Sequence, residues 1–566
     1  MKPAATNRRI VLLAGVFMTL LAVALGRAVW LQAVRGPELA AMALRQHRET
    51  VVVPAGRGTI FDRNGEPLAI GRQATTVYAN PRQVDNPRAL TLAIGKALDA
   101  EPGAVYPLLV DRSRGFVYVE RKADPLKAEE LEKLGFAGLG FYPEELRTYP
   151  QGPVAAQVLG FAGLDNKGLE GLERSLEKVL AGRPGSQTIV KDPFGRALDV
   201  VSTRAETPGR NVRLTIDKQV QANAEEVLQE TVRRWGASAA SAIVMDPYTG
   251  CVLAMAVAPR FNANRFPTTR ADRRRNRAVT DTYEPGSTFK LVAIAAALEE
   301  GVVTPTTAFR LPPTLKVADR VIHESHIRGT QRMTVKQIVE YSSNIGTITI
   351  AQHLGEGRMA SWIDRFGFGR ETGIDFPGES PGFALPLEEW SGSTIGTVPI
   401  GHGIAVTPIQ MARAYAAIAN GGVLVRPRLI DRIDGRPVAG SQRRRIVSRT
   451  VSERMLGMLK GVVVEGTGRE AAIPGYTVAG KTCTAAKIDP DGRYSTSRYV
   501  ASFIGLVPAT KPRLVIMVMV DEPRGNFYGG VVAAPAFRVI ARFNLQHFEV
   551  PPDAPQTATP DGSRSQ

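Results

Sequence analysis

The sequence predicts an α/β protein whose first helix spans a membrane. An apolar run follows the N-terminus, and strand-like segments lie both before and after a block of helical segments. The chain has 566 residues, of which 44% are hydrophobic and 22% charged, so it is long enough for several domains and too apolar to be disordered throughout. Its 55 glycines and 39 prolines follow no fixed period, which excludes a collagen or a coiled coil.

The first element is the apolar run at residues 10–34, in which Arg27 is the one charged residue. About 20 apolar residues are enough to cross a bilayer. Lys2, Arg8 and Arg9 precede the run, so the positive-inside rule leaves residues 1–9 in the cytoplasm and the rest of the chain outside. Arg27 would reach the outer headgroups or face a partner helix.

The alternative interpretation of this run is a cleaved signal peptide with a site at Ala22-Val-Ala24. The run continues past that site through Trp30 and Leu31, which favours a retained span. In either case most of the chain is exported.

The chain is basic, with 71 Lys and Arg against 54 Asp and Glu and a net charge of +17. Such an excess indicates an acidic partner, which could be nucleic acid, a membrane surface or a wall polymer. Export excludes nucleic acid, so we expect the arginine runs at 273–275 and 443–445 to be solvated loops or surface facing wall or lipid. Cys251 and Cys483 are too few for a disulfide framework.

Residues 35–207 precede the main α/β region and contain short, mixed segments. Residues 55–69 alternate turn residues with apolar pieces, as in an extended strand-and-turn segment. Breaker clusters at 182–185 and 207–210 punctuate the region, and we expect a domain boundary near the second. Residues 551–566 are rich in Pro, Thr, Ser and Asp, which predicts a disordered tail.

Between residues 208 and 550 the hydrophobic periodicity predicts strands at both ends and helices in the middle. The expected strands are 212–216, a hairpin of 241–245 with 252–257, and the late strands 500–507 and 514–520; the expected helices are 218–235, 291–300 and 409–419. This order predicts an α/β sandwich whose sheet is closed by segments far apart in the sequence.

A candidate nucleophile lies in the segment Tyr283-Glu-Pro-Gly-Ser287-Thr-Phe-Lys290. Pro285 and Gly286 break the chain before an apolar helical run, so Ser287 is expected in the first turn of a helix with Lys290 on the same face. A helix N-terminus and a desolvated pocket both disfavour an ammonium, so the lysine can act as base toward the serine. Taken alone, S-x-x-K also fits a solvated pair on any helix.

Two further elements make the pair specific. Ser342 and Asn344 form an S-x-N element between helical segments, and Lys481 begins Lys-Thr-Cys-Thr on a strand-like stretch. S-x-x-K, an S-x-N-type element and K-T-G, in this order, are the signature of serine penicillin-recognising enzymes.

With these elements the chain resembles the class B penicillin-binding proteins, the monofunctional peptidoglycan transpeptidases, and most of all their division-septum-specific member. The resemblance extends over nearly the whole chain and includes the segments 57–65, 147–150, 168–173 and 191–196. It implies a single N-terminal transmembrane helix, an elongated α+β pedestal domain, and a serine β-lactamase-like transpeptidase domain with a central antiparallel sheet flanked by helices. The implied domains are a cytoplasmic N-terminus (1–9), an anchor (10–34), a pedestal of the dimerisation type (35–207), a transpeptidase domain (208–550) and a tail (551–566).

The resemblance also implies the catalytic roles. Ser287 would attack the penultimate D-alanine carbonyl of a stem peptide, and Lys290 would take the serine proton. Ser342 would relay a proton to the leaving amine, and Lys481 would polarise Ser342 and attract the terminal carboxylate.

The remaining implied residues bind the substrate. Asn344 would hydrogen-bond the substrate amide, and Thr482 and Thr484 would bind its carboxylate. The backbone N–H groups of Ser287 and Thr484 would form the oxyanion hole. No cofactor and no metal are expected.

Implied ligands and partners are D-Ala-D-Ala stem peptides, β-lactams, the bacterial cytoplasmic membrane, a polytopic septal glycosyltransferase and other division proteins. The alternatives are an elongation-specific class B enzyme and a weakly catalytic scaffold that keeps the fold. A β-lactamase or β-lactam sensor is disfavoured, because neither needs so long a pedestal.

Cys483 departs from the family pattern, in which glycine occupies this position. Side chains alternate along a strand, so Thr482 and Thr484 share one face while Lys481 and Cys483 share the other. Cys483 should therefore point into packed space beside the nucleophile's helix. It would either behave as a small buried hydrophobic residue or alter acylation, redox sensitivity or catalysis.

Two patterns suggest other chemistry. Residues 475–482 match the P-loop pattern, but no good central strand precedes them and strand-forming residues follow, which disfavours nucleotide binding. His323 and His326 are spaced i,i+3 with no further ligand nearby, so we interpret them as loop histidines.

Overall fold

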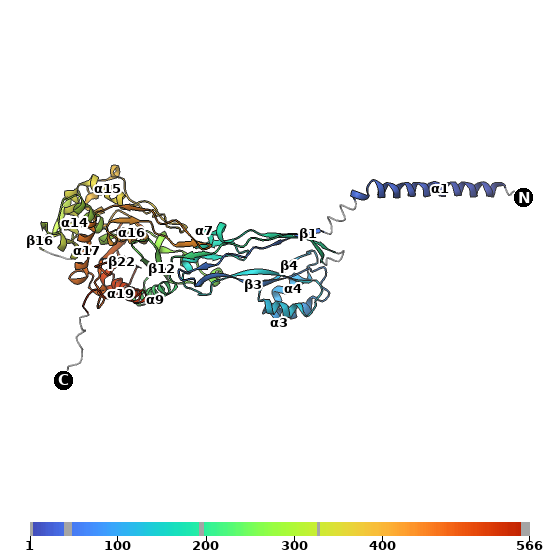
Figure 1. Ribbon diagram of the computed structural model, residues 1–566, viewed down its shortest axis with the longest axis horizontal. Helices are drawn as coiled ribbons and strands as arrows, with labels where there is room; N and C mark the ends of the chain where they lie inside the picture. Colours follow the sequence, from blue (N-terminus) through green and yellow to red (C-terminus); the bar gives the residue numbers. More distant parts are fainter. Residues whose placement is uncertain (1–3, 39–47, 192–196, 325–328, 556–566) are drawn as a thin grey trace, which may run out of the picture. The chain divides into compact units, whose positions relative to one another are not determined.

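A computed structural model describes residues 4–38, 48–191, 197–324 and 329–555 (Figure 1). By its internal contacts the chain divides into two compact units, one of Met1–Gly56 with Gly182–Gly209 and one of Arg57–Ala181 with Arg210–Gln566. Most of the expected pedestal falls in the second unit together with the expected transpeptidase domain. The domain limits at 35, 207 and 550 therefore stay predictions.

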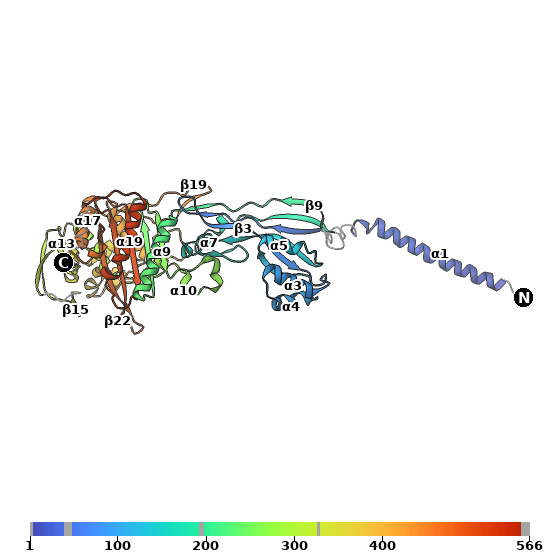
Figure 2. The ribbon, with the colours of Figure 1, turned by 90° about the horizontal axis from the view of Figure 1, so that it is seen from below.

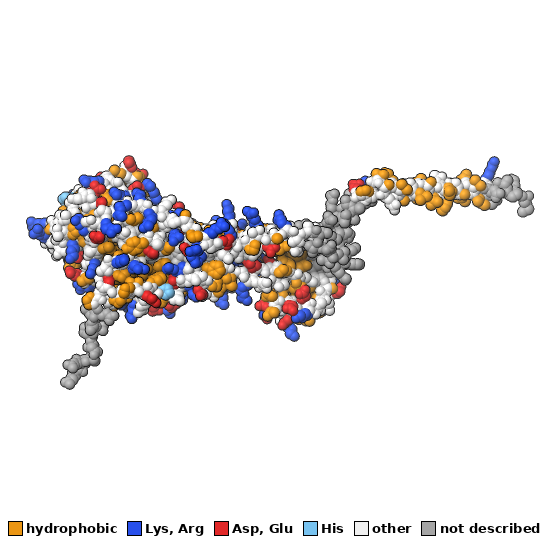
Figure 3. Space-filling view, viewed as in Figure 1, with side chains coloured by type: hydrophobic (Ala, Val, Ile, Leu, Met, Phe, Trp, Pro, Cys, Tyr) orange, Lys and Arg blue, Asp and Glu red, His pale blue; other side chains and the backbone are white. Residues whose placement is uncertain are grey.

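The first unit contains the N-terminal helix and a small sheet. Helix α1 (Ala4–Ala33) includes Arg8–Ala33, a stretch with mean hydropathy 2.2 that is long and apolar enough to cross a membrane. Apolar side chains follow its length in Figure 3. Strands β1 (Arg48–Val53), β8 (Gly185–Lys191) and β9 (Ala197–Arg204) form an antiparallel sheet in the order β1-β8-β9.

The second unit contains a seven-stranded sheet in the order β19-β18-β10-β2-β3-β4, in which β5 also pairs with β3. Its strands are β2 (Ile60–Phe61), β3 (Pro67–Ala79), β4 (Val117–Ala123), β5 (Leu139–Thr148), β10 (Val212–Leu214), β18 (Ile430–Ile433) and β19 (Arg436–Pro437). Helices α3 (Pro87–Leu98), α4 (Pro102–Val110) and α5 (Pro125–Glu132) pack with β3 and β4 in a separate hydrophobic cluster.

Three of the segments that carry the family resemblance meet at one buried carboxylate in this unit. Glu173 is fully buried, and its two oxygens pair with Arg57 Nε and Arg147 Nε, each at 2.6 Å. Arg147 Nη1 also donates to the carbonyl of Gly58. A buried carboxylate held by two guanidinium groups is strongly destabilised when one partner is lost, so these segments depend on one another.

A five-stranded antiparallel sheet, in the order β12-β11-β23-β22-β21, carries the core of the second unit. The strands are β11 (Ala239–Met245), β12 (Val252–Ala258), β21 (Ala479–Ile488), β22 (Tyr494–Val507) and β23 (Leu514–Asp521). This confirms the predicted hairpin of 241–245 with 252–257 and the closure of the sheet by distant segments. Strands β11, β12 and nearly all of β23 are buried, because helices cover both faces.

One face of this sheet is covered by α9 (Lys218–Trp235) and α19 (Ala534–His547), which lie side by side over it (Figure 2). Helix α9 has the limits that the sequence predicts. Asp217 caps its first turn by accepting hydrogen bonds from Gln219 and Val220 N–H, and Gly236 ends it in the left-handed conformation.

The other face packs against the helical part of the unit, whose core is α12 (Lys290–Glu299) and α16 (Pro408–Ala419). Further helices there include α13 (Val335–Glu340), α14 (Asn344–Leu354), α15 (Glu356–Phe366) and α17 (Arg449–Val464). The predicted helices at 291–300 and 409–419 are confirmed to within one residue. Helix α16 begins at a capping box between Thr407 and Gln410, with Pro408 in its first turn.

Both arginine runs are at least partly exposed, as expected, but they lie partly in regular elements rather than in loops. Arg443–Arg445 form β20, an exposed strand paired with β17 (Val423–Val425), while the first two arginines of the run 273–275 end helix α10 (Ala271–Arg274). One of these, Arg274, pairs with Glu170 at 3.4 Å.

The described part of the predicted tail is ordered. Asp553 accepts hydrogen bonds from Thr477 N–H and from the hydroxyls of Thr477 and Thr510. Composition predicted disorder from residue 551, but it does not register these contacts, so the prediction begins too early. Residues 556–566 of that tail, 192–196 of the segment 191–196, and His326 lie outside the described residues.

Candidate active site

Ser287 lies in a short 3-10 turn, Gly286–Thr288, and α12 begins three residues after it at Lys290. The prediction of a helix start is thus correct in place, although the first turn is 3-10. Gly286 has φ +47°, and its N–H donates to the carbonyl of Gly401 at 3.2 Å. Tyr415, on α16, donates its hydroxyl proton to the carbonyl of Thr288. The turn is therefore held from two sides, while Ser287 itself stays partly exposed.

The second element lies between two helices. Ser342 follows α13 in the left-handed conformation, with φ +58°, and α14 begins at Asn344. The next residue, Ser343, caps α14 by accepting a hydrogen bond from the N–H of Gly346. A non-glycine residue with positive φ is strained, and such strain is concentrated at functional sites.

All three elements meet at the Ser342 hydroxyl. Lys481 Nζ donates to Ser342 Oγ at 2.8 Å, and Lys290 Nζ donates to the same oxygen at 3.2 Å. Lys290 also donates to the Ser342 carbonyl at 2.6 Å and to Asn344 Oδ1 at 2.7 Å. With both lone pairs of the hydroxyl oxygen engaged, its proton points away from the two lysines. This geometry suits a proton relay.

The electrostatics favour such a relay. Lys481 is 2% exposed, and burial lowers the pKa of its ammonium to about 8, although the nearby Cys483 sulfur opposes this shift. A desolvated Lys481 ammonium on the Ser342 hydroxyl makes it easier to remove a proton from this cluster near neutral pH.

Thr482 and Thr484 do not join this cluster. Thr482 Oγ1 lies 2.7 Å from Thr467 Oγ1, and Thr484 Oγ1 accepts a hydrogen bond from Gly529 N–H at 3.1 Å. These contacts put both hydroxyls on the face opposite Lys481, as the alternation along β21 predicts. Since Thr484 Oγ1 accepts, its proton is free to be donated.

Cys483 points toward the nucleophile's turn, as predicted. It is 2% exposed, and a Cβ added to Gly286 would come within 2.7 Å of its sulfur. Burial raises the pKa of the thiol, while the N–H groups of Ser287 and Thr288 act in the opposite direction. Cys483 therefore sits as a neutral thiol directly beneath the residues that carry the nucleophile.

Sequence reasoning missed four side chains around the site. Glu324 accepts hydrogen bonds from Ser343 Oγ and from Asn344 N–H, and so fixes the start of α14. Glu284, His402 and Tyr494 form a second cluster, in which both Glu284 and Tyr494 contact His402. Glu284 could have been found from the sequence, because it lies three residues before Ser287. Glu324 and Tyr494 come from distant hairpins, so nothing in the sequence indicates that they lie near the site.

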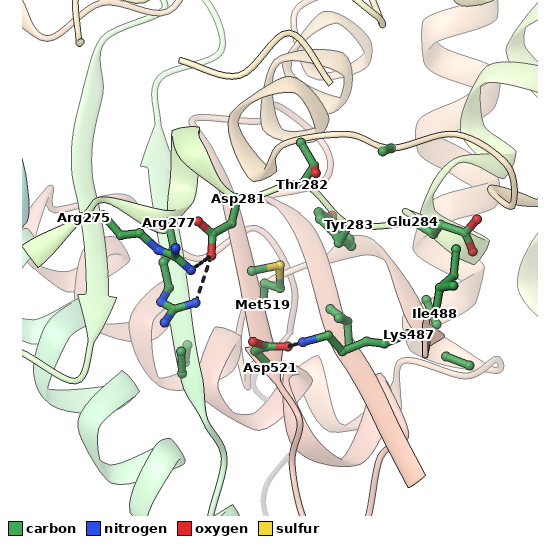
Figure 4. A pocket seen from close by; sticks show the side chains of 16 residues that line it. Arg275, Arg277, Asp281, Thr282, Tyr283, Glu284, Lys487, Ile488, Met519 and Asp521 are labelled. Carbon is green, nitrogen blue, oxygen red and sulfur yellow. Dashed lines mark hydrogen bonds and ion pairs between the residues drawn. The ribbon is translucent and has the colours of Figure 1, made fainter. Parts of the chain in front are cut away.

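A cavity of about 330 Å³ is lined by Tyr283 and Glu284, which precede the turn of Ser287, and by the end of β21. Figure 4 shows Glu284 and Ile488 at one end of it and Arg275, Arg277 and Asp281 at the other. The two arginines pair with Asp281, and Lys487 pairs with Asp521, so the charges that line it are largely neutralised within the chain.

The geometry rules out the P-loop interpretation. Residues 479–488 form strand β21, and no helix begins at Lys481. His323 lies at the end of β15 (Arg320–His323), where its carbonyl accepts a hydrogen bond from Asn344. Within the described ranges, no group of three or more His, Cys, Asp or Glu side chains is placed to hold a metal.

Comparison with known proteins gives independent evidence on the family of this chain. Residues 240–542 match the model of the penicillin binding protein transpeptidase domain, and residues 52–214 match that of the penicillin-binding protein dimerisation domain. The chain is 33% identical to the Escherichia coli peptidoglycan D,D-transpeptidase FtsI over 554 residues, covering 96% of this chain and 93% of that one. It is also 33% identical to a probable peptidoglycan D,D-transpeptidase, PenA, of Neisseria gonorrhoeae, covering 98% and 96%.

A solved structure is similar over the same extent. Penicillin binding protein 3 of Mycobacterium tuberculosis, complexed with aztreonam, superposes with a TM-score of 0.71 at 32% identity. The match covers 90% of this chain and 99% of that one.

Proposed function

The chain belongs to the class B penicillin-binding proteins, which are peptidoglycan D,D-transpeptidases, and we propose that it crosslinks stem peptides during septal wall synthesis through an acyl ester on Ser287. The observation that carries the assignment of residues is the convergence of Lys290 and Lys481 on the Ser342 hydroxyl. A solvated serine–lysine pair would not assemble a second serine and a second lysine around it.

In the acylation step Ser287 Oγ attacks the penultimate D-alanine carbonyl and loses its proton to Lys290. The C–N bond to the terminal D-alanine breaks. Ser342 passes its proton to the leaving amine and receives in its place the proton that Lys290 took from Ser287, so Lys290 ends the step neutral. Lys481 supports this transfer, because its hydrogen bond lowers the cost of negative charge on Ser342. The relay needs no cofactor.

The substrate would bind along β21, the edge strand of the five-stranded sheet. An edge strand has unpaired backbone groups that an extended peptide can pair with. The N–H groups of Ser287 and Thr484 form the oxyanion hole, and a single donor of this kind is typically worth about 3–4 kcal/mol of transition-state stabilisation. Thr484 donates its free hydroxyl proton to the terminal carboxylate, and Thr482 exchanges its contact with Thr467 to do the same.

Asn344 must also exchange partners to bind the substrate amide. Its Oδ1 accepts from Lys290, and its Nδ2 donates to the carbonyl of His323. The second contact, at 3.2 Å, is the longer of the two and is the one that a substrate carbonyl would replace.

Labelling with a fluorescent penicillin tests the nucleophile. β-Lactams acylate the serine because their ring resembles the D-Ala-D-Ala bond. We expect a labelled band in the full-length protein and none in Ser287→Ala, with thermal unfolding unchanged. Labelling that persists in Ser287→Ala would remove Ser287 from this role, and an unlabelled wild type would support a scaffold.

The septal role is supported by the similarity to FtsI and by the resemblance of the pedestal segments to those of the division-septum-specific member. The alternative is lateral wall synthesis. Depletion of the protein separates the two, since loss of septal crosslinking gives filaments and loss of lateral crosslinking gives rounded cells.

The apolar helix α1 and the relatives support a membrane-anchored protein. We propose that residues 1–9 face the cytoplasm and that the catalytic domain lies outside the cytoplasmic membrane. A polytopic septal glycosyltransferase and other division proteins are the partners that this placement suits, because crosslinking must follow glycan synthesis at the same membrane.

A further inference from the structure

Glu284, His402 and Tyr494 form a hydrogen-bonded cluster that the acylation steps above do not use. His402 Nδ1 lies 3.1 Å from Glu284 Oε2 and 3.0 Å from the Tyr494 hydroxyl. Glu284 Oε1 accepts from Gly403 N–H at 2.7 Å and from the Tyr494 hydroxyl at 3.2 Å. The three side chains come from the segment before the nucleophile, from the loop after η5 (Val398–Ile400), and from β22.

These contacts determine the tautomer of His402. A carboxylate can only accept, so the Nδ1 atom facing Glu284 carries the ring proton. The neutral ring then presents Nε2 as its acceptor. In the described part of the chain no hydrogen bond to Nε2 is found. A carboxylate that orients an imidazole through Nδ1 and leaves Nε2 free is the arrangement that serves a general base in the Ser-His-Asp triad.

The cluster adjoins the nucleophile's turn. Glu284 precedes Ser287 by three residues, and Gly401, next to His402, accepts the hydrogen bond from Gly286 N–H. A Cβ on Gly401 would come within 2.3 Å of the Gly286 backbone, so the two chain segments are in direct contact. The His402 side chain is 29% exposed while that of Glu284 is 13% exposed, so the imidazole is open to an incoming molecule and the carboxylate lies behind it.

We propose that His402 is a further catalytic residue, which accepts the proton of the attacking amine in the crosslinking half-reaction. The inference rests on the proposed acyl ester at Ser287. The acceptor stem peptide arrives as an ammonium, which has no lone pair with which to attack. Nε2 takes one proton from it, and Glu284 stabilises the imidazolium that results.

The rest of the step balances without another reactant. The free amine attacks the ester carbonyl, a C–N bond forms, and the C–O bond to Ser287 breaks. The second proton lost by the amine passes through Lys290 to the Ser287 oxygen, which restores the free hydroxyl. The imidazolium releases its proton to water before the next cycle.

Among the described residues, few other charged groups face His402. Glu284 and Tyr494 touch it, and Arg320 on β15 acts electrostatically on Tyr494, whose pKa is raised mainly by burial and further by Glu284. The ring planes of His402 and Tyr494 meet edge to face with centroids 5.2 Å apart. The competing interpretation is that the cluster only ties the loop at Gly401 to the hairpin of β21 and β22.

Measuring the two half-reactions separately distinguishes these interpretations. The full-length protein in detergent is acylated with a D-alanyl thioester donor, and the acyl-enzyme is then released by D-alanine as the acceptor amine. In His402→Gln we expect aminolysis to fall about tenfold or more, while acylation by a fluorescent penicillin changes less than about twofold. His353→Gln, an exposed histidine on α14, is the matched control and should change neither rate.

The pH profile supplies a readout that a tie between two segments would not affect. His402→Gln depends on acceptor amine that has already lost its proton in solution, so its deficit in aminolysis relative to the wild type should shrink as pH rises. Glu284→Gln should weaken aminolysis in the same direction. Equal losses in acylation and aminolysis, or an unchanged pH profile in His402→Gln, would overturn the inference. Failure of the wild type to be acylated at all would instead contradict the proposed function.

Discussion

Cys483 occupies the position of a family glycine, and its sulfur fills the space under Gly286. We expect Cys483→Gly to leave a cavity there, to lower the free energy of unfolding by about 1 kcal/mol and to reduce the second-order rate constant of penicillin acylation several-fold, because the turn that carries Ser287 loses its support. Cys251→Ala is the control, since Cys251 lies away from the turn. Equal rate constants in wild type and Cys483→Gly would show that the thiol does not influence acylation.

Gly286 and Cys483 should also be coupled. Gly286→Ala places a Cβ 2.7 Å from the sulfur, a contact that requires the turn to move, and we expect acylation to be nearly abolished. Adding Cys483→Gly removes the clash, although the strain of φ +47° remains. A double-mutant cycle on acylation rates should therefore give partial rescue, and strictly additive losses would contradict the contact.

Lys481 shows the cost of a buried ammonium. Its pKa is lowered to about 8 by burial, so below pH 8 the folded protein holds a desolvated charge that the unfolded chain keeps in water. Between pH 8 and the ordinary lysine range the unfolded chain binds more protons, so this cost shrinks as pH rises.

We therefore expect Lys481→Met to abolish acylation and yet to raise the free energy of unfolding at pH 7 by up to about 3 kcal/mol. Thermal unfolding measured between pH 7 and 10 should show that the gain in stability of Lys481→Met over the wild type shrinks toward high pH. A variant that is less stable than the wild type at pH 7 would contradict the inference that the buried Lys481 ammonium destabilises the folded protein.

At the scale of elements, α9 carries a second buried charge. Glu225 is fully buried, burial raises the pKa of its carboxyl to about 7, and Oε1 accepts from Ala155 N–H and Gln221 Nε2. A carboxyl with a raised pKa in the folded state favours folding at low pH and loses this contribution as pH rises through about 7.

Glu225→Gln should remove this pH dependence. The amide keeps the acceptor for Ala155 and Gln221 and cannot ionise, so we expect higher stability than wild type above pH 7, by up to about 3 kcal/mol, and no gain near pH 4. The midpoint of thermal unfolding at the two pH values measures the effect. If Glu225→Gln gained the same stability at both pH values, the gain would have to come from packing and not from ionisation of Glu225.

Among the elements, those with a strong local signal were predictable. Helix α9 has its cap at Asp217 and its left-handed glycine at Gly236, and the β11–β12 hairpin has alternating apolar residues around a turn. The 3-10 form of the turn at Ser287 was not predictable, because it depends on the hydrogen bond between Gly286 and Gly401. The same holds for Glu324 and His402, which reach the site only through tertiary packing.

At the scale of the whole molecule, the motifs predicted that Lys290, Ser342 and Lys481 lie together, and they do meet. They predicted the strand face of Thr482 and Thr484 but not their partners Thr467 and Gly529. The contact with Gly529 depends on α18 (Gly529–Val532) lying beside β21. Order in the described part of the tail was missed for a similar reason. Composition cannot show that Asp553 accepts hydrogen bonds from Thr477.

The membrane topology can be tested by introducing one cysteine at a time into a Cys251→Ala background that keeps Cys483. We expect a membrane-impermeant maleimide to label Lys511→Cys in spheroplasts and to label Thr6→Cys only after the membrane is opened, because positive charge keeps the N-terminus inside. Buried Cys483 should stay unlabelled in the folded protein. Labelling of Thr6→Cys in sealed spheroplasts would reverse the topology.

The pairing of β11 with β23 has a consequence for export. A chain that crosses the membrane from its N-terminus delivers β11, then Ser287 and all the intervening helices, long before β23 emerges. Until then the central sheet lacks its middle strand, and β21 has no sheet to join. On the proposed topology, the three motif elements therefore come together only when the last strands have crossed the membrane.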